Sequence, residues 1–352
     1  MTDKIGIGII GGGGISAEGH ICGYQADPRC EVVALYDMDE AKMAEQAQRL
    51  GVPHTYTSLD AFLNRIDIHA VSICSPDHLH GDHGHAALQA GKHVLCEKPM
   101  TTMREDAARL VQDVRTTGLV FLGGHVYHFR PDYQAMATAY RTGELGEVWL
   151  AEGDYISDMR PFYGPSSYTP WRTEGGAPQD ILLGGGCHPL GLMLWAMQTT
   201  VTEVFAYANH KAEPQLPLND CYVVSLKLAN GAVGKLIAAS GNRGYAPSGG
   251  HLVLYGTQGT IWDGRFYRNN REEHRTDVVH DWKEQFKDYK PRVHNTRQVH
   301  HWAEQCTHFL DCIQGQAQPL TSVVDGARVV ATLTAAIESA STGRPVLVDN
   351  QF

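Results

Sequence analysis

Several features that mark special classes of protein are missing from this sequence. Its eight cysteines are scattered without a C-x-x-C pair, which suits reduced thiols better than a disulfide framework or a zinc site. No apolar run approaches the roughly 20 residues that a membrane helix needs. No apolar segment precedes Lys4, so a secretory signal is not expected. We therefore expect a cytoplasmic protein that holds no metal and enters no membrane.

The chain is also short of positive charge. It carries 29 Lys and Arg against 39 Asp and Glu, a formal net charge of -10, which argues against nucleic acid and anionic membranes as partners. A hydrophobic content of 43% and a charged content of 19% are those of an ordinary globular protein. With 352 residues the chain is long enough for two domains, each with its own core.

Strand and helix patterns alternate through the first third of the chain. The expected strands are 5–10, 31–37, 68–74, 93–96 and 120–123, and the expected helices are 39–50, 58–65, 81–90 and 102–117. This alternation predicts an α/β fold with a parallel, doubly wound sheet and right-handed crossovers. Thr101 or Thr102 is available to cap the last of these helices.

A glycine-rich turn lies between the first strand and the residues that follow. Read as G-x-G-x-x-[GA], Gly11 and Gly13 fill the first two positions and Ser16 stands in the third. Gly11 allows a tight turn, and Gly13 lets the backbone approach a pyrophosphate that helix N–H groups then face. Gly14 and Ile15 complete the same candidate site. A plain turn is the alternative interpretation.

The second strand pattern ends in an acid. Asp37 comes 26 positions after Gly11, where a carboxylate can bind the adenosine ribose of NAD and repel the extra phosphate of NADP. The alternative is an aspartate that caps the helix beginning near residue 39. Together the glycine turn and Asp37 predict a dinucleotide site, with NAD favoured and NADP less favoured.

Lys98 stands between Glu97 and Pro99 at the carboxyl end of a strand, where open α/β sheets bind ligands. Pro99 fixes the backbone just after the lysine, so its ammonium group can be aimed. The segment 75–80, Ser-Pro-Asp-His-Leu-His, follows another strand in the same way. An ordinary surface lysine at a strand end is the alternative.

From residue 124 the pattern changes to strands with few helices. The expected strands are 147–156, 203–209, 221–228, 232–240, 251–255 and 260–263, and the expected helices are 131–141, 298–314 and 323–342. Many strands alternate apolar with polar residues, as in a half-exposed antiparallel sheet, and Asn230-Gly231 indicates a hairpin. The polar stretch 265–300 is expected to be an irregular surface segment. We expect a dinucleotide-binding domain at 1–123 and a second α/β domain at 124–352.

A histidine follows three glycines in the second half. The glycines at 184–186 let a helix start close against another backbone or a ligand, and His188 falls in its first turn. Histidine is suited to moving a proton near neutral pH. A nicotinamide dehydrogenase needs a base for the alcohol proton and a group that steadies the alkoxide, which His188 and Lys98 would supply. A structural core histidine is the alternative.

With these motifs the chain resembles the glucose–fructose oxidoreductase, inositol dehydrogenase and MocA family. The segments that carry the resemblance are 9–15, 75–80, 97–99, 129–131 and 184–188. The resemblance implies a Rossmann domain, a second domain with a large, open, mostly antiparallel sheet, and oxidation or reduction of a sugar, polyol or sugar derivative. It places the family's lysine and catalytic histidine on Lys98 and His188. It also implies packing of sheet on sheet in a homodimer or homotetramer.

The candidate site residues form three groups. The expected cofactor-binding residues are Gly11, Gly13, Gly14, Ile15, Asp37, Ser75, Pro76, His78, His80, Glu97 and Lys98. The expected substrate-binding residues are Tyr127, Arg130, Asp158, Trp171, Arg172 and Asp180. Lys98 and His188 are the expected catalytic pair, with NAD as the cofactor and a small carbohydrate or polyol as the substrate.

The chain departs from the family pattern beside the histidine. Members usually read Asp-x-Gly-x-His-x-x-Asp, whereas Gly184 and Gly191 stand here at the two acidic positions. Asp180, Asp158 or Asp220 could supply a carboxylate from elsewhere. Three functions stay open: an NAD-dependent sugar or polyol dehydrogenase, an NAD-requiring glycosidase or sugar-modifying enzyme acting by transient oxidation, and a non-catalytic regulator that binds NAD and a sugar.

Overall fold

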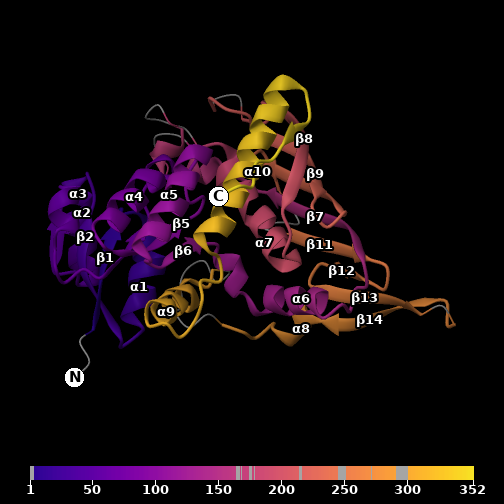
Figure 1. Cartoon of the computed structure of the whole chain (residues 1–352), viewed down its shortest axis with the longest axis horizontal. Helices are drawn as coiled ribbons and strands as arrows, with labels where there is room; N and C mark the ends of the chain where they lie inside the picture. The colour runs from indigo at the N-terminus through magenta and orange to yellow at the C-terminus, as the bar shows by residue number, and fades with distance from the viewer. Residues whose placement is uncertain are drawn as a thin grey trace. The chain divides into compact units, whose positions relative to one another are not determined.

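The computed structural model describes residues 4–163, 167, 169–173, 177, 179–213, 216–244, 251–270, 272–290 and 300–352. The chain divides into two compact units, which we describe separately (Figure 1). The first comprises residues 1–126, 290–327 and 352, and the second comprises residues 127–289 and 328–351. The expected domain boundary between residues 123 and 124 stays a prediction.

The first unit is built on a six-stranded parallel sheet in the order β3-β2-β1-β4-β5-β6. Its strands are β1 (Ile5–Ile10), β2 (Cys30–Tyr36), β3 (His54–Tyr56), β4 (Ala70–Ile73), β5 (His93–Glu97) and β6 (Phe121–Gly124). Its helices include α1 (Cys22–Gln25), α2 (Glu40–Leu50), α3 (Leu59–Leu63), α4 (His80–Gln89), α5 (Arg104–Thr117) and α9 (Trp302–Ile313). The doubly wound α/β fold is thereby confirmed. The strand order reverses between β1 and β4, where open sheets of this kind bind ligands.

The central strands are buried because helices cover the sheet. Every residue of β4 is buried, as is typical of parallel strands with helices on both faces. Helices α4 and α5 pack together over β4 and β5 (Figure 1). Helix α9 returns late in the chain to pack on the helix after the glycine turn, where a Cβ atom at Gly19 would lie 2.6 Å from the Trp302 ring. Gly19 is therefore required for this close approach.

The second unit is built on a nine-stranded sheet in the order β14-β13-β12-β11-β7-β10-β9-β8-β15. Its strands are β7 (Val148–Ile156), β8 (Val201–Asn209), β9 (Cys221–Leu228), β10 (Val233–Ala239), β11 (His251–Gly256), β12 (Thr260–Trp262), β13 (Arg265–Asn270), β14 (Arg275–Asp281) and β15 (Val346–Leu347). All neighbours are antiparallel except β7 and β10. The other helices are α6 (Pro131–Arg141), α7 (Cys187–Met197), α8 (Trp282–Gln285) and α10 (Val323–Thr342). The mostly antiparallel sheet is confirmed.

One face of this sheet is covered and the other is open. A Cβ atom at Gly153 of β7 would lie 3.0 Å from Pro189 Cβ, so α7 packs directly on the strand. On the opposite face large apolar side chains are exposed, among them Trp149, Tyr207, Val223, Val233 and Trp262. The alternation of buried and exposed residues along β9 follows the pattern expected from the sequence. In the described part of the chain, no helix has the length and apolar character to cross a membrane.

Two expectations about local structure were wrong. The stretch 265–300 was expected to be irregular, yet β13, β14 and α8 form within its described residues. Phe266 is the one fully buried residue among the described residues of these two edge strands, and most of their other side chains are polar. The helix after Lys98 begins at Arg104 with Met103 as its N-cap and no side-chain cap. Thr101 instead accepts a hydrogen bond from the Met103 N–H, at 3.3 Å, and neither Thr101 nor Thr102 caps the helix.

Candidate functional site

The glycine turn after β1 combines one crowded glycine with two open ones. Gly11 has a φ of 100°, and a Cβ atom there would lie 2.7 Å from the Ser75 N atom. Glycine is therefore required at this position, both for backbone conformation and for space. At Gly13 and Gly14 a Cβ atom would meet nothing within 4 Å, so the backbone is open to a ligand. This arrangement fits a pyrophosphate lying along the turn.

Asp37 lies directly beside this turn. Its Oδ2 atom accepts a hydrogen bond from the Gly12 N–H at 2.5 Å, and its Oδ1 atom accepts one from the Asp39 N–H at 2.9 Å. The N-cap of α2 is Asp39, whose side chain accepts from the Lys42 N–H at 3.1 Å. The alternative interpretation of Asp37 as the helix cap is therefore wrong. The glycine turn and Asp37, the two sequence features that predict a dinucleotide site, are therefore adjacent in the structure.

The 75–80 loop follows β4, and two histidines, His80 and His83, form hydrogen bonds that hold it in place. The His80 ring is 1% exposed, with Nε2 2.8 Å from the Ser75 carbonyl oxygen and Nδ1 2.6 Å from that of Pro99. His80 thus joins the loop to the segment just after Lys98. The Ser75 hydroxyl lies 2.9 Å from Nδ1 of His83, and burial together with the charge of His80 lowers the pKa of His83 to about 4. Pro76 and His78 are partly exposed on the same loop.

Glu97 ends a chain of buried polar groups that the sequence did not reveal. The Tyr24 hydroxyl lies 2.7 Å from Ser72 Oγ, which lies 3.2 Å from Nδ1 of His20. Nε2 of His20 lies 3.0 Å from Oε1 of Glu97, whose Oε2 accepts the Lys98 N–H at 3.2 Å. Burial raises the pKa of Glu97, but the hydrogen bond and charge of His20 outweigh it and hold the pKa to about 2. The network thus keeps an ionised carboxylate at the backbone of Lys98.

Lys98 follows β5 and is partly exposed. His125 follows β6, and its pKa is lowered to about 4. Burial is the larger cause, and the positive charge of Lys98 is the second. The cofactor-binding residues expected from the sequence follow β1, β2, β4 and β5, whose carboxyl ends lie at one edge of the parallel sheet. The first unit therefore brings these expected residues together. A charged lysine at that edge can stabilise a developing negative charge.

In the second unit His188 lies between two tyrosines. It is 6% exposed, in the first turn of α7, which continues the π-helical segment Leu182–Gly186. Its ring centroid is 4.7 Å from that of Tyr127 and 5.8 Å from that of Tyr155, which stacks on it. A Cβ atom at Gly185 would lie 2.5 Å from the Tyr155 ring, so this glycine admits the tyrosine beside the histidine. The aromatic rings fix the plane of the imidazole.

The space beside Gly184 is filled by Gln179. A Cβ atom at Gly184 would collide with the carboxamide of Gln179 and lie 2.8 Å from its Cγ atom. Gln179 Oε1 in turn accepts a hydrogen bond from Nη1 of Arg172. Gly184 precedes His188 by one helical turn, so both positions lie on the same helix face. An amide bound to a guanidinium therefore stands where the family pattern has an aspartate.

The first two acids proposed as replacements are engaged elsewhere. Asp158 binds the Arg160 guanidinium, with Nε to Oδ1 at 2.8 Å, and this hydrogen bond lowers its pKa to about 2. Asp180 accepts from the Tyr222 hydroxyl and from the Leu182 N–H, both at 2.7 Å. Burial raises the pKa of Asp180 above its usual value. Both carboxylates therefore bind neighbouring groups of the second unit.

The remaining candidates in this unit are also held by neighbours. Asp220 is fully buried and accepts from the backbone N–H groups of residues 212 and 213, each at 2.7 Å. Arg130 binds Asp132 at 2.6 Å and lies over the Tyr133 ring at 4.4 Å. Trp171 lies under the Arg172 guanidinium, 4.6 Å from ring centroid to Cζ. Gln179, bound to Arg172, lies against Gly184, and Asp180 binds the Leu182 N–H of the same helical segment.

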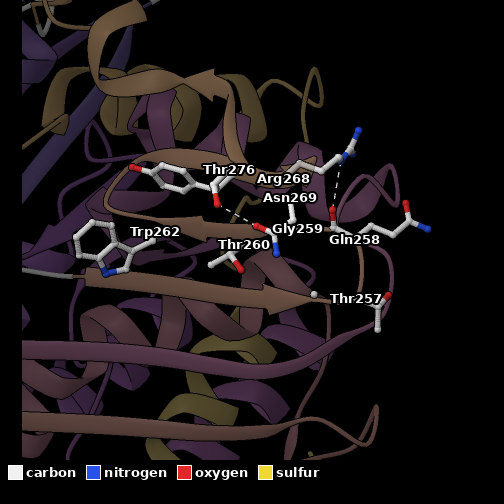
Figure 2. A pocket seen from close by; sticks show the side chains of 10 residues that line it. Thr257, Gln258, Gly259, Thr260, Trp262, Arg268, Asn269 and Thr276 are labelled. Carbon is white, nitrogen blue, oxygen red and sulfur yellow. Dashed lines mark hydrogen bonds between the residues drawn. The ribbon is translucent and has the colours of Figure 1, made fainter. Parts of the chain in front are cut away.

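A hollow of about 760 Å³ lies at a different place in the second unit, and Figure 2 shows the residues that line it. They are Gly256, Thr257, Gln258, Gly259, Thr260, Trp262, Tyr267, Arg268, Asn269 and Thr276. Thr260 and Trp262 flank the buried Ile261 of β12 and so point to the open face of the sheet. Helix α7 packs on the opposite face. None of the residues expected from the sequence lines this hollow.

Comparisons with known proteins agree with this architecture. The model described as "Oxidoreductase family, NAD-binding Rossmann fold" matches residues 5–125, and "Oxidoreductase family, C-terminal alpha/beta domain" matches residues 137–348. The 1,5-anhydro-D-fructose reductase of Ensifer adhaerens is 24% identical over 347 residues, 97% of this chain and 98% of that protein. The levoglucosan dehydrogenase of Pseudarthrobacter phenanthrenivorans is 26% identical over 293 residues, 73% of each chain.

Solved structures show the same fold. An oxidoreductase domain protein from Kribbella flavida superimposes with a TM-score of 0.84 at 22% identity, covering 99% of this chain and 100% of that one. At 22% identity this similarity is evidence for the fold alone. The two family matches cover most of the chain, and they agree with the Rossmann unit and the α/β second unit. The chain therefore belongs to the glucose–fructose oxidoreductase, inositol dehydrogenase and MocA family of NAD-binding oxidoreductases.

Proposed function

We propose that this protein is an NAD-dependent dehydrogenase that oxidises a hydroxyl group of a sugar, polyol or sugar derivative. The observation that carries the proposal is the meeting of the open glycine turn, Asp37 and Lys98 at one edge of the parallel sheet. Two relatives named for sugar chemistry, a levoglucosan dehydrogenase and an anhydrofructose reductase, support the substrate class.

The residues at the sheet edge suit a dinucleotide. Bound NAD would supply the hydride acceptor, the nicotinamide ring. Gly13 and Gly14 would bind the pyrophosphate through their exposed backbone, with Gly11 and Ile15 shaping the turn. Asp37 would bind the adenosine ribose and disfavour the extra phosphate of NADP by charge repulsion. The 75–80 loop, with Pro76 and His78 partly exposed, would cover the cofactor.

Two side chains would handle the substrate proton and the negative charge that develops on the substrate oxygen. His188 would take the proton of the substrate hydroxyl while the carbon-bound hydride passes to the nicotinamide, leaving a carbonyl product. The ammonium group of Lys98 would stabilise the negative charge that develops on the substrate oxygen. Tyr127 and Tyr155 orient the imidazole, and Glu97 holds the backbone from which Lys98 projects.

The substrate would lie against residues of the second unit. Trp171 offers an apolar ring face, Arg172 offers a donor, and Tyr127 lies against the proposed base. Arg130, Asp158 and Asp180, also expected to bind substrate, are bound to neighbouring side chains and would act chiefly by shaping this region. The sugar hydroxyls would be recognised by hydrogen bonds and the ring by stacking.

A second candidate function is suggested by Gly184. Gly184 leaves no acid at this position of the family pattern. In this second function the enzyme oxidises its substrate transiently and cleaves or modifies a glycosidic bond. The retained cofactor then returns the hydride and is recycled in place. The two functions differ in what happens to free cofactor. A dehydrogenase reduces added NAD in proportion to product, whereas transient oxidation converts substrate without net NADH.

The experiment that tests the proposal is a screen for NAD and NADP reduction over sugars, inositols, sugar acids and glycosides, with product analysis for each. Net NADH formation with one substrate class supports a dehydrogenase. Substrate conversion without NADH supports transient oxidation. Sugar and NAD binding by calorimetry with no turnover of any compound contradicts both enzyme functions and favours a regulator.

We further propose a cytoplasmic homodimer or homotetramer. All eight cysteines lie in described residues and are free thiols, which suits a reducing compartment. The open sheet face exposes Tyr207, Val223 and Trp262, and apolar patches of this kind are candidate protein interfaces.

A further inference from the structure

The His80 ring points each of its two nitrogens at a backbone carbonyl oxygen. Nδ1 lies 2.6 Å from the oxygen of Pro99, and Nε2 lies 2.8 Å from that of Ser75. Both distances are those of good N–H···O hydrogen bonds. A carbonyl oxygen can only accept, and a neutral imidazole has a single N–H group, so it would turn a lone pair toward one of the two oxygens. Both contacts are hydrogen bonds only when both ring nitrogens carry a proton.

The His80 ring is shielded from water. The residue is 1% exposed, so solvent cannot replace a hydrogen bond that the ring fails to make. Burial opposes a charged imidazole, because an ion is better solvated in water than in a protein interior. Two charge-assisted hydrogen bonds act in the other direction, since each is stronger than a neutral one. A lone pair held at the same distance from a carbonyl oxygen would be repelled by it, which further favours the charged ring.

The charged and titratable groups around His80 act in both directions. Those on the loop itself and on the adjoining ends of α4, β5 and α5 are Asp77, His78, Asp82, His83, Glu97, Lys98, Arg104, Glu105, Asp106 and Arg109. Asp82 and Asp106 are both paired with Arg109. His83 is neutral at pH 7, because burial and, after it, the charge of His80 lower its pKa to about 4.

Two buried acids remain on the side of the segment that His80 binds. Burial is the largest cause that raises the pKa of the Cys96 thiol, and the charges of Glu97 and Asp77 are the next. Two negative charges therefore lie close to the end of β5, just before Pro99. They favour a positive charge on the imidazole, whereas the ammonium group of Lys98 opposes it.

We propose that His80 is a positioning residue that carries a positive charge in the folded protein and, through its two hydrogen bonds, holds the 75–80 loop against the segment that follows Lys98. The inference rests on the proposed function, in which this loop covers NAD and Lys98 serves the reaction. Ser75 begins the loop and Pro99 directly follows the lysine, so one ring spans the two parts of the candidate site. Loss of either proton releases one carbonyl oxygen, so a rise in pH should loosen the loop.

Neutron diffraction from crystals of the wild-type protein, exchanged into D₂O near neutral pD, tests the charge directly. We expect deuterium on both Nδ1 and Nε2 of His80. The His83 ring is the internal control, and it should carry deuterium on one nitrogen only, because its pKa is about 4. A His80 ring with deuterium on a single nitrogen would overturn the inference.

Hydrogen exchange tests the positioning role without any cofactor. At pH 7 the backbone amides of residues 75–80 and 100–103 should exchange at least about 5-fold faster in His80→Gln than in the wild type, because a glutamine amide cannot span both carbonyl oxygens. His80→Asn is the second variant, and melting temperatures show which variants are folded. The matched control is His85→Gln, on the same helix and bound to Asp113, which should leave these amides unchanged. Unchanged exchange in a folded His80 variant would overturn the role.

The pH dependence of NADH binding connects the charge with the cofactor. The wild-type Kd for NADH should rise at least about 5-fold from pH 7 to pH 9.5, as the imidazolium loses a proton. His80→Gln has no group to titrate at this position, so it should bind NADH more weakly at pH 7 and change less than about 2-fold over the same range. A parallel rise in both proteins would assign the pH dependence to another group and overturn the positioning role.

The outcomes distinguish this inference from the proposed function. Deuterium on both nitrogens of His80 and faster exchange in His80→Gln, in a protein that does not bind NADH, would support the charged bridge and refute the dehydrogenase. Reduction of NAD with a sugar by a protein whose His80 carries a single ring deuterium would leave the dehydrogenase standing and refute the charged bridge.

Discussion

His20 and Glu97 face each other in the interior of the first unit, with Nε2 of the histidine 3.0 Å from Oε1 of the glutamate. His20 is fully buried and Glu97 is 6% exposed, so both need hydrogen-bond partners within the protein, and each supplies one to the other. Glu97 also accepts the backbone N–H of Lys98. The helix after the glycine turn is thus linked through two side chains to the lysine of the candidate site.

Glu97→Gln should lower the free energy of unfolding by about 1–3 kcal/mol at neutral pH, because the amide keeps the shape but loses the charge-assisted bonds. The stabilisation should depend on pH. The pKa of Glu97 is held at about 2, below its ordinary value of 4.5, so its contribution is complete above pH 4.5 and is lost as the pH falls toward 2. Urea titrations from pH 7 downward measure it, with exposed Glu45→Gln as control. Equal stability of Glu97→Gln and wild type would contradict this role.

Two buried histidines should make the fold sensitive to mild acid. The pKa of His83 and that of His125 are lowered from 6.5 to about 4, chiefly by burial. Unfolding lets each bind a proton below pH 6.5, so stability should fall between pH 6.5 and 4 by up to about 1.4 kcal/mol per pH unit for each histidine. Urea titrations at pH 7, 6, 5 and 4.5 test this. His125→Asn should flatten the slope, whereas exposed His54→Asn should leave it unchanged.

Asp37→Ser should weaken discrimination against NADP. The serine hydroxyl can still accept the Gly12 N–H, but the charge that repels the extra phosphate is gone. We expect the ratio of kcat/KM for NAD to that for NADP to fall at least about 10-fold. Asp39→Ser is the matched control, because it removes an adjacent charge and keeps a residue able to cap α2. Tighter binding of NADP than of NAD by the wild type would show that Asp37 does not select the cofactor.

The open sheet face gives a prediction about assembly. Tyr207 on β8 and Val223 on β9 are a cross-strand pair exposed on that face. Light scattering at micromolar concentration should give a dimer or tetramer, and Tyr207→Lys with Val223→Lys should shift it toward smaller species. Met38→Lys, at an exposed apolar residue of the first unit, should not. A monomeric wild type would refute the assembly.

The sequence predicted best where one signal dominates. Strand β1 and helix α10 were predicted to the residue, because buried runs and sustained apolar periodicity leave few alternatives. Strands β13 and β14 were missed because edge strands with mostly exposed side chains lack that signal. No sequence motif indicated that His20 would contact Glu97.

The contacts around the candidate site could not be read from the sequence because they join distant residues. Nothing in the chain linked Gln179 to the space at Gly184, or His80 to the carbonyl oxygen of Pro99. Similarly, Asp158 and Asp180 looked equivalent to other acids until their partners Arg160 and Tyr222 were located. Residue types and spacing were enough to identify the catalytic candidates. The side chains that contact them could be identified only from the structure.

The central claim is that Lys98 and His188 serve one proton transfer. Lys98→Ala and His188→Ala should each lower turnover about a hundred- to ten-thousand-fold while NADH binding stays close to that of the wild type. The double variant should lose less than the product of the two effects, because the groups act together. Lys211→Ala, at an exposed position, is the control.

The most direct single measurement is the turnover number of Lys98→Ala, taken on protein whose melting temperature matches that of the wild type. The account predicts a loss of at least about a hundred-fold with retained NADH binding. Turnover within a few-fold of the wild-type value in this well-folded variant would contradict it.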